Sequence, residues 1–521
     1  MKKQLLMASL IAASGASFGQ TVGDAALGTY NFTDNGLPQG GNTSQYWPQV
    51  FSENGEKSVI WTQGVSGDVG VFHTALNSNY IGSQIDTVVA FTGILNSDGD
   101  GTDLRTAYNA NADKFCAIYR FADNLSVVTK DFSLKAKTFS STDFTDAELV
   151  VEGPMDYAND LPAAWEMAAG PNNTFGMVYM SDGASSTNSQ ILFKTIDGAT
   201  GVVTPASATN MLTGTVVSNF GAREPSVAWN EQEQVWGITY IWGTGNSTKI
   251  VFVALDASGS LLIPDKDVIN DNTVLSTDPI IKTDGDGFVL VWKDFRDFQI
   301  PGNPSAGSGM PSSRLCQLTK TGDQVTNSGT SPFFDSNDNS LIVSNPYQYG
   351  VYLFQDVEVV TPGEKYGVTW VTQDAPYAVY FAEVQVSNTG AMNSTIPVAI
   401  DDATFTSDKV SMAYENGKYI ISHMEYNSLK YKNRIAVGEF QAGGGGTGIN
   451  EAEMKLNAYP NPTSGIVNFT EVISEITVLD MKGAVIETYN NVSQIDLSNL
   501  TEGIYLIKDD TGSFTKVNVI K

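Results

Sequence analysis

A short strand pattern recurs along the chain, in which a large or apolar residue is followed four positions later by a ring. Side chains alternate across a strand, so residues four apart lie on the same face. The positions between the apolar residue and the ring are mostly β-formers, as in residues 288–292 and 366–370. Apolar runs of this kind indicate strands that are covered on both faces. The rings stand at Trp61, Tyr108, Tyr179, Tyr240, Trp292, Trp370 and His423.

Each recurrence belongs to a predicted meander of four strands. The fourth repeat, residues 224–263, shows the order most clearly, because turn residues separate its strands. Four-stranded units repeated around an axis form a β-propeller. The sequence therefore predicts an all-β fold with a propeller of about seven blades.

The two ends of the predicted propeller complement each other. The last repeat has three strands, over residues 408–414, 419–424 and 433–440, and lacks a fourth. Residues 22–32 form a possible strand with no local partner. We expect this segment to complete the last blade and so close the ring.

Long connections are not scattered along the repeats. Three of them, residues 131–160, 297–313 and 323–350, join the second and third strands of a blade or one blade to the next. In a propeller such connections leave from the same face. One face is therefore expected to be rich in loops, and loops carry function more often than short hairpins do.

Composition describes a folded acidic protein. Of the 521 residues, 41% are hydrophobic and 17% are charged, and 57 Asp and Glu against 29 Lys and Arg give a net charge of −28. A surface of this sign repels nucleic acid and anionic membranes, and it attracts divalent cations. Nucleic acid is therefore excluded as an expected partner.

The beginning of the chain has the three parts of a secretory signal peptide. Lys2 and Lys3 precede an apolar run over residues 5–13, and small residues follow. We expect residues 1–20 to be this signal peptide, and no later apolar run has transmembrane length. Two cysteines, Cys116 and Cys316, are too few for a disulfide framework.

The remainder divides into three predicted parts. Residues 21–441 hold the propeller, and residues 442–455 form a glycine-rich linker. Residues 456–521 contain short alternating strands separated by turn residues, which is typical of a compact β-sandwich.

This tail resembles the C-terminal sorting domain of proteins exported by the bacterial type IX (Por) secretion system. The resemblance covers about 65 residues and implies that the tail engages the type IX machinery. It also implies passage through the periplasm to the medium or the outer cell surface. The residues that carry it are Tyr459, Pro460, Asn461, Pro462, Gly465, Gly483, Gly503, Tyr505 and Lys516.

A second, smaller resemblance lies in the fifth repeat. Trp292, Asp294 and Arg296 match the W-x-D-x-R signature of secreted bacterial propeller repeats. The resemblance supports the propeller fold. Asp294, Arg296 and Asp297 are expected either to form a polar site or to form an inter-blade ion pair and hydrogen-bond set near the end of a strand.

A calcium site is one candidate in the second repeat. Asp98, Asp100 and Asp103 alternate with glycines as at the start of a calcium loop, but Ala107 stands where a twelfth-position acid would be needed. A simple hairpin turn is the alternative.

Histidine chemistry is poorly supported. His73 and His423 are the two histidines, and His423 occupies a ring position of the repeat. His73 has no partner histidine or acid at metal-ligand spacing, and with only two histidines a zinc site or a catalytic triad would be strained. We interpret both as packed rings.

The sequence favours a binding or adhesion protein for extracellular glycan or protein. The alternative is a polysaccharide-active hydrolase or lyase that uses carboxylates on the loop-rich face. A purely structural surface protein is a third class. Among 57 acidic residues the sequence does not single out a catalytic pair.

Overall fold

A computed structural model represents the chain. The described residues are 44–53, 56–64, 69–76, 86–91, 104–125, 130–156, 164–181, 190–210, 222–244, 247–270, 275–295, 311–328, 334–335, 339–344, 351–372, 378–395, 397–400, 406–427, 432–440, 458–459, 463–479, 485–501, 503–509 and 514–520. The chain divides into two compact units, whose described residues fall within 21–442 and 443–521, and each is described by itself. The predicted signal peptide and the whole of the predicted linker lie outside the described residues.

The larger unit consists of antiparallel sheets. Its strands, sheet by sheet, are β1 (Ser44–Glu53), β2 (Glu56–Gly64), β3 (Val69–Leu76) and β4 (Asp86–Phe91); β5 (Leu104–Asn109), β6 (Lys114–Leu125), β7 (Lys130–Phe139) and β8 (Leu149–Asp156); β9 (Trp165–Ala169), β10 (Thr174–Ser181), β11 (Gln190–Asp197) and β12 (Val203–Asn210); β13 (Ala222–Asn230), β14 (Val235–Thr244), β15 (Ser247–Asp256) and β16 (Leu261–Ile269); β17 (Ser276–Asp284), β18 (Gly287–Asp294), β19 (Ser312–Thr319), β20 (Phe334–Asp335) and β21 (Ser340–Ile342); β22 (Val351–Thr361), β23 (Lys365–Thr372), β24 (Val379–Val386), β25 (Met392–Ser394) and β26 (Val398–Ala399); and β27 (Thr406–Glu415), β28 (Lys418–Asn427) and β29 (Lys432–Phe440).

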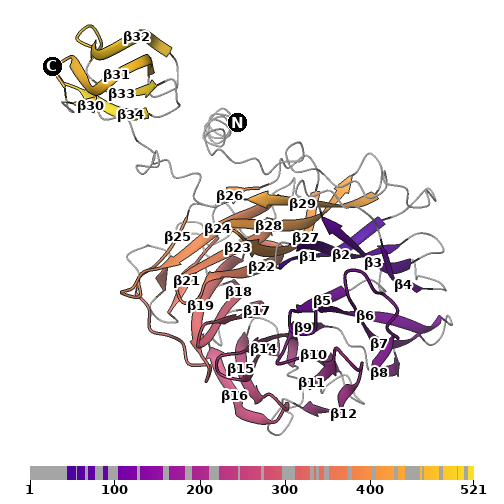
Figure 1. The fold of residues 1–521 in the computed structure, drawn as a ribbon. Coiled ribbons are helices and arrows are strands. Elements are labelled where there is room, and N and C mark those ends of the chain that lie inside the picture. Colours follow the sequence, from indigo (N-terminus) through magenta and orange to yellow (C-terminus); the bar gives the residue numbers. More distant parts are fainter. Residues whose placement is uncertain are drawn as a thin grey trace, which may run out of the picture. The chain divides into compact units, whose positions relative to one another are not determined.

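These sheets are the blades of a β-propeller. The first strands of successive sheets are neighbours in the cyclic order β1, β5, β9, β13, β17, β22 and β27, and β27 in turn contacts β1. Figure 1 shows the sheets arranged around a common centre, with these first strands innermost. Seven sheets built from the described residues therefore close a ring, which confirms the predicted all-β propeller.

The last blade contains three strands among the described residues, β27, β28 and β29. The segment expected to add the fourth strand, residues 22–32, lies outside the described residues. The direct contact between β27 and β1 closes the inner ring by side-chain packing between blades.

The recurring rings form the core between the blades. Six of the seven ring positions identified in the sequence are buried, and Tyr108 is half-buried. The fully buried large side chains include Trp61, Trp236, Trp292 and Trp370. The strand pattern was thus read correctly as the inside of the fold.

Glycines next to the rings explain how the blades fit together. A Cβ atom at Gly176 of β10 would lie 2.4 Å from the indole of Trp236 in the next blade. Gly237 receives the ring of Phe288 in the same way, at 2.6 Å. The absence of a side chain lets each blade accept the ring of its successor at close-packed density.

Two segments expected to be long loops are partly strands. Residues 131–160 contain most of β7 and all of β8, which complete the second blade. Residues 323–350 contain the short strands β20 and β21, which add to the fifth blade. Charged residues such as Lys135 and Lys137 obscure the strand pattern of β7, because alternate side chains on an outer strand face solvent.

The smaller unit is the predicted C-terminal β-sandwich. Its strands are β30 (Ala458–Tyr459), β31 (Ile466–Leu479), β32 (Val485–Asp496), β33 (Gly503–Asp509) and β34 (Phe514–Val519). β31 pairs with β30, β32 and β33, and its pairing with β32 shifts register between Asn468 and Ile473. β31 is thus one long, irregular strand where the sequence predicts short ones, and it contributes to a single apolar core.

Candidate functional site

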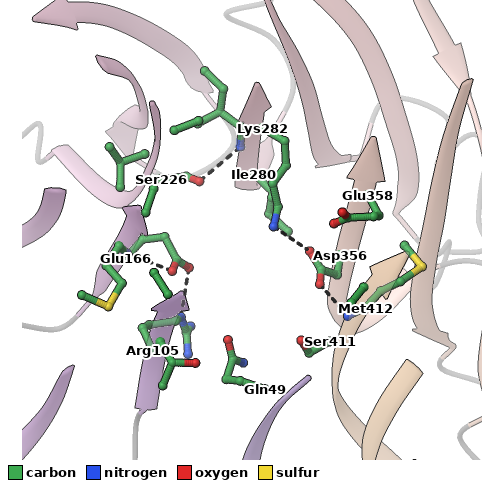
Figure 2. A pocket seen from close by; sticks show the side chains of 18 of the residues that line it. Gln49, Arg105, Glu166, Ser226, Ile280, Lys282, Asp356, Glu358, Ser411 and Met412 are labelled. Atoms are coloured by element: carbon green, nitrogen blue, oxygen red, sulfur yellow. Dashed lines mark hydrogen bonds and ion pairs between the residues drawn. The ribbon is translucent and has the colours of Figure 1, made fainter. Parts of the chain in front are cut away.

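A cavity of 560 Å³ lies at the centre of the propeller unit. Residues from the first strands of all seven sheets line it, so we call it the funnel. Figure 2 shows side chains from several blades pointing into it. Because seven distant segments of the chain meet here, the funnel is the place where the repeats can build a combined site.

The polar side chains of the funnel have a structural cause. Each first strand has one edge that faces the centre and lacks a neighbouring strand, which leaves backbone N–H groups to be satisfied. Side chains of one blade accept these hydrogen bonds from the next. The bonds are Asp278 N to Glu224 Oε2 (2.7 Å), Ile281 N to Ser226 Oγ (3.1 Å), Met412 N to Asp356 Oδ2 (2.9 Å) and Val50 N to Ser411 Oγ (3.3 Å).

Two ion pairs lie on the walls of the funnel. Arg105 Nε donates to Glu166 Oε2 over 3.0 Å, between the second and third blades. Lys282 Nζ lies 4.0 Å from Asp356 Oδ1, between the fifth and sixth blades. Figure 2 shows the two pairs on different sides of the cavity, with Glu358 beside the second.

The funnel shifts the pKa values of its charged groups. Burial raises the pKa of Asp356, and the ammonium of Lys282 opposes the shift without cancelling it. Burial lowers the pKa of Lys282, but the attraction of Asp356, Glu358 and Glu166 outweighs it, so the net shift is upward. The ammonium of Lys282 is therefore held in its charged state among carboxyl groups.

The start of the first strands forms one end of the funnel, which we call its mouth. Trp47, Glu224, Asp278 and Lys409 all have left-handed backbone conformations, with φ between 47° and 54°. Each lies where the pairing of the first and second strands shifts register, and each lines the cavity. Non-glycine residues rarely adopt this conformation, and it is common at functional sites.

One side of the mouth is aromatic and cationic. The Lys409 ammonium lies 4.0 Å from the ring centre of Trp47 and 3.2 Å from that of Phe354. The two rings meet edge to face, with their centres 5.5 Å apart. The guanidinium of Arg105 lies 4.7 Å from the same Trp47 ring. These contacts join the sixth, seventh, first and second blades.

The other side of the mouth is acidic. Glu224 and Asp278 come from the fourth and fifth blades, and Lys293 forms an ion pair with Asp278. Burial raises the pKa of Glu224, and the neighbouring Asp278 carboxylate raises it further. Arg223 lies 3.6 Å from Glu224 and compensates in part. Each carboxyl group on this side therefore has a cation beside it, whereas Lys409 and Arg105 on the other side lie against ring faces.

The predicted calcium ligands cannot be placed. Asp98, Asp100 and Asp103 lie outside the described residues. Among the residues that the structure describes, no group of three or more His, Cys, Asp and Glu is arranged to hold a metal ion.

His73 lies in a constellation that the sequence did not suggest. Its Nε2 atom is 3.1 Å from Ser58 Oγ, and its Nδ1 atom is 3.8 Å from Asp86 Oδ2. Ser58, His73 and Asp86 thus follow one another as the serine, histidine and aspartate of a catalytic triad do. However, His73 is completely buried, and the rings of Phe115 and Phe144 lie 5.7 and 5.6 Å from its own. A substrate has no access, so the packed-ring interpretation is the one that agrees with the burial.

Burial of His73 predicts an acid-labile blade. Desolvation lowers the pKa of His73 to about 4 from 6.5, and the attraction of Asp86 opposes this only in part. As the pH falls from about 6.5 to about 4, the unfolded chain binds a proton that the folded chain does not, so the free energy of unfolding should drop by about 3 kcal/mol. Urea unfolding of His73→Gln should show a shallower decline over this range than the unchanged protein. Parallel declines would contradict the prediction.

The W-x-D part of the second resemblance is structural. The indole Nε1 of Trp292 donates to Asp294 Oδ2 over 2.9 Å, and Arg314 lies 3.9 Å from the same oxygen. All three side chains are buried within the fifth blade. Arg296 lies outside the described residues. The motif therefore fixes the end of a strand and does not line the funnel.

The sequence did not identify the funnel residues. Arg105, Glu166, Lys282 and Asp356 lie on four different first strands, and only the ring closure brings them together. A partial signal exists at the mouth, because Trp47, Glu224 and Asp278 each precede a proline at the start of a first strand. A residue before proline favours extended backbone, so its left-handed conformation here is visible only in the structure.

The fold and the match of the C-terminal residues together define an exported β-propeller with a C-terminal sorting unit. Residues 457–521 match the family described as the secretion system C-terminal sorting domain. The chain is therefore cargo of type IX secretion, which takes it to the cell surface or the extracellular space. Tyr459, Gly465, Gly503, Tyr505 and Lys516 of the predicted motif lie in the described part of this unit; Pro460, Asn461, Pro462 and Gly483 lie outside it.

Several solved structures are similar to the chain in shape. The polysaccharide lyase Uly1 has 9% identity and a TM-score of 0.45, over 82% of this chain and 94% of its own. The phage phi92 endosialidase has 10% identity and a TM-score of 0.39, over 91% and 85%. An α-L-arabinanase from Penicillium chrysogenum, complexed with arabinobiose, has 10% identity and a TM-score of 0.35, over 68% and 94%. Likenesses of this degree say nothing about the activity of this chain.

No curated protein is significantly similar to the chain in sequence. Within the described part of the chain, no helix has the length and apolar character required to cross a membrane.

Proposed function

We propose that this exported propeller is a glycan-binding protein and that the funnel is its binding site. The observation that carries the proposal is the 560 Å³ cavity at the ring centre, lined by charged and hydroxyl side chains from different blades. Its volume is in the usual range for sites that bind small molecules or short segments of a polymer.

The shape of the site favours a glycan over a folded protein. A stable interface between two folded proteins buries about 800 Å² on each partner, usually over a broad surface. A central cavity instead admits a narrow chain or a chain end. Sugar hydroxyl groups both donate and accept hydrogen bonds, and the alternation of Arg105, Glu166, Lys282 and Asp356 offers both kinds of partner.

Hydrolysis of a glycan is the second candidate. Carboxyl groups from the third and sixth blades, Glu166 and Asp356, lie on different sides of the same cavity (Figure 2). Glu224 at the mouth has a raised pKa, as a general acid requires. Glycosidases use one protonated and one ionised carboxyl group, so the funnel has the residue types for this chemistry.

Incubation of the purified full chain with a panel of polysaccharides tests both functions. Retention of a polysaccharide without new reducing ends indicates binding, whereas released fragments indicate hydrolysis. Asp356→Asn should weaken retention at least tenfold, since the variant loses a wall charge of the funnel. Asp323→Asn is the matched control, because Asp323 also pairs with a lysine, Lys266, but is largely exposed and does not line the cavity. Equal retention by both variants, with unchanged melting temperatures, would contradict the proposal.

A further inference from the structure

The aromatic rings at the mouth are covered by cations. Lys409 contacts the faces of Trp47 and Phe354, and Arg105 lies over the ring of Trp47. A sugar that stacked on these rings would have to displace the charged groups. The rings are therefore better understood as supports that hold an ammonium and a guanidinium at the mouth by cation–π attraction.

The backbone also positions these groups. Trp47 and Lys409 are two of the four left-handed residues of the mouth, with φ of 54° and 47°. A non-glycine residue in this conformation is strained relative to an ordinary one. The register shifts that contain them turn Trp47 and Lys409 toward one another across the junction of the seventh and first blades.

The positive charges of Lys409 and Arg105 contrast with the negative charge of the chain as a whole. The whole chain has a net charge of −28, so most of its surface repels anions. At the mouth, Lys409 of the seventh blade and Arg105 of the second both contact the ring of Trp47. Arg105 is also paired with Glu166, and the carboxyl groups of the fourth and fifth blades, Glu224 and Asp278, lie beside Arg223 and Lys293. A ligand with an anionic group would therefore enter in one orientation, with its hydroxyl groups toward the carboxyl side.

We propose that the mouth of the funnel binds a polysaccharide that carries carboxylate or sulfate groups, with Lys409 and Arg105 as the groups that contact the anion. This inference rests on the proposed glycan binding and adds the class of glycan. Guanidinium and ammonium groups donate charge-assisted hydrogen bonds to both kinds of anion. Partial desolvation by the aromatic rings strengthens such contacts relative to those of fully hydrated side chains.

The test compares four polymers against the purified full chain by isothermal titration calorimetry. Polygalacturonate supplies carboxylates, dextran sulfate supplies sulfates, dextran supplies neither, and polyglutamate supplies carboxylates on a peptide. We expect binding of polygalacturonate, dextran sulfate or both. We also expect affinity to fall as NaCl is raised from about 0.05 M to about 0.5 M, because salt screens the contacts.

Substitutions of Lys409 and Arg105 test whether the anion is bound at the mouth. Lys409→Gln should weaken binding of the anionic polysaccharide at least tenfold, and Arg105→Lys, which keeps the charge, should weaken it less. Lys320→Gln is the matched control, since Lys320 is an exposed lysine paired with Glu233 outside the cavity, and it should bind as the unchanged chain does. Melting temperatures check that each variant folds.

Other outcomes separate this inference from the proposed function. Binding of dextran alone would overturn the anionic class and leave glycan binding standing. Equal affinity for polyglutamate would show that the mouth recognises charge and not a glycan, and would overturn the inference. If Lys409→Gln bound the anionic polysaccharide as the unchanged chain does, the proposed contact between Lys409 and the anion would be overturned. No binding of any polysaccharide, here or in the wider panel, would contradict both proposals.

Discussion

Removal of residues 456–521 is expected to stop release of the protein and to leave it in the periplasm with a folded propeller. These residues contain the whole match to the sorting domain, and their apolar core is made from their own strands. Immunoblots of medium, cell surface and periplasm should show a loss of at least tenfold from the first two fractions. The retained protein should melt as the propeller of the full chain does.

A transfer experiment is the control for this prediction. Residues 442–521, fused after a leader and an unrelated folded reporter, should send the reporter to the medium or the cell surface. The same fusion without the tail should remain in the periplasm. Normal export of the truncated chain would contradict the role of the tail.

Trp236→Ala is expected to have the largest effect on the stability of the propeller. The side chain is completely buried, and it packs against Phe193 and Trp229, with ring centres 5.4 and 4.9 Å away. Loss of a buried Trp side chain costs about 3–5 kcal/mol. Urea unfolding measures the change, and Val150→Ala, at an exposed position, should change stability by less than about 0.5 kcal/mol.

Gly176, which lies next to the indole of Trp236, allows a second test of this packing. Gly176→Ala places a Cβ atom 2.4 Å from Trp236 and should cost about 1–3 kcal/mol by overpacking. In a background of Trp236→Leu the same substitution should cost clearly less, because the clash is removed. Additive costs in this double-mutant cycle would show that the ring and the glycine do not determine the fit between blades.

Much of the propeller could be predicted from the sequence because its core obeys local rules. The pair Phe288 and Trp292 lies on one face of a strand and is completely buried, as the alternation of side chains requires. The outer strands were harder to predict from the sequence. β7 and β8 lie in segments that the sequence predicts as a long loop, because Lys135 and Lys137 interrupt the apolar positions of β7 and Gly153 and Pro154 interrupt β8.

The same local rules could not predict the candidate site from the sequence. The expectation of carboxylates on a loop-rich face named no pair, and the carboxyl groups that line the funnel, such as Glu166 and Asp356, lie on inner strands. Their proximity to Arg105 and Lys282 depends on the closure of the ring, which no local pattern encodes. The left-handed conformation of Lys409 likewise had no signal, because no proline or glycine marks it.

A crystal structure of the full chain with a short oligogalacturonate tests the central claim most directly. The account predicts the sugar in the funnel, with a carboxylate oxygen about 3 Å from Lys409 Nζ or an Arg105 guanidinium nitrogen. It also predicts hydroxyl groups directed toward Glu224 and Asp278. An oligosaccharide bound on the outer strands of the blades, with the funnel filled by water, would contradict the account.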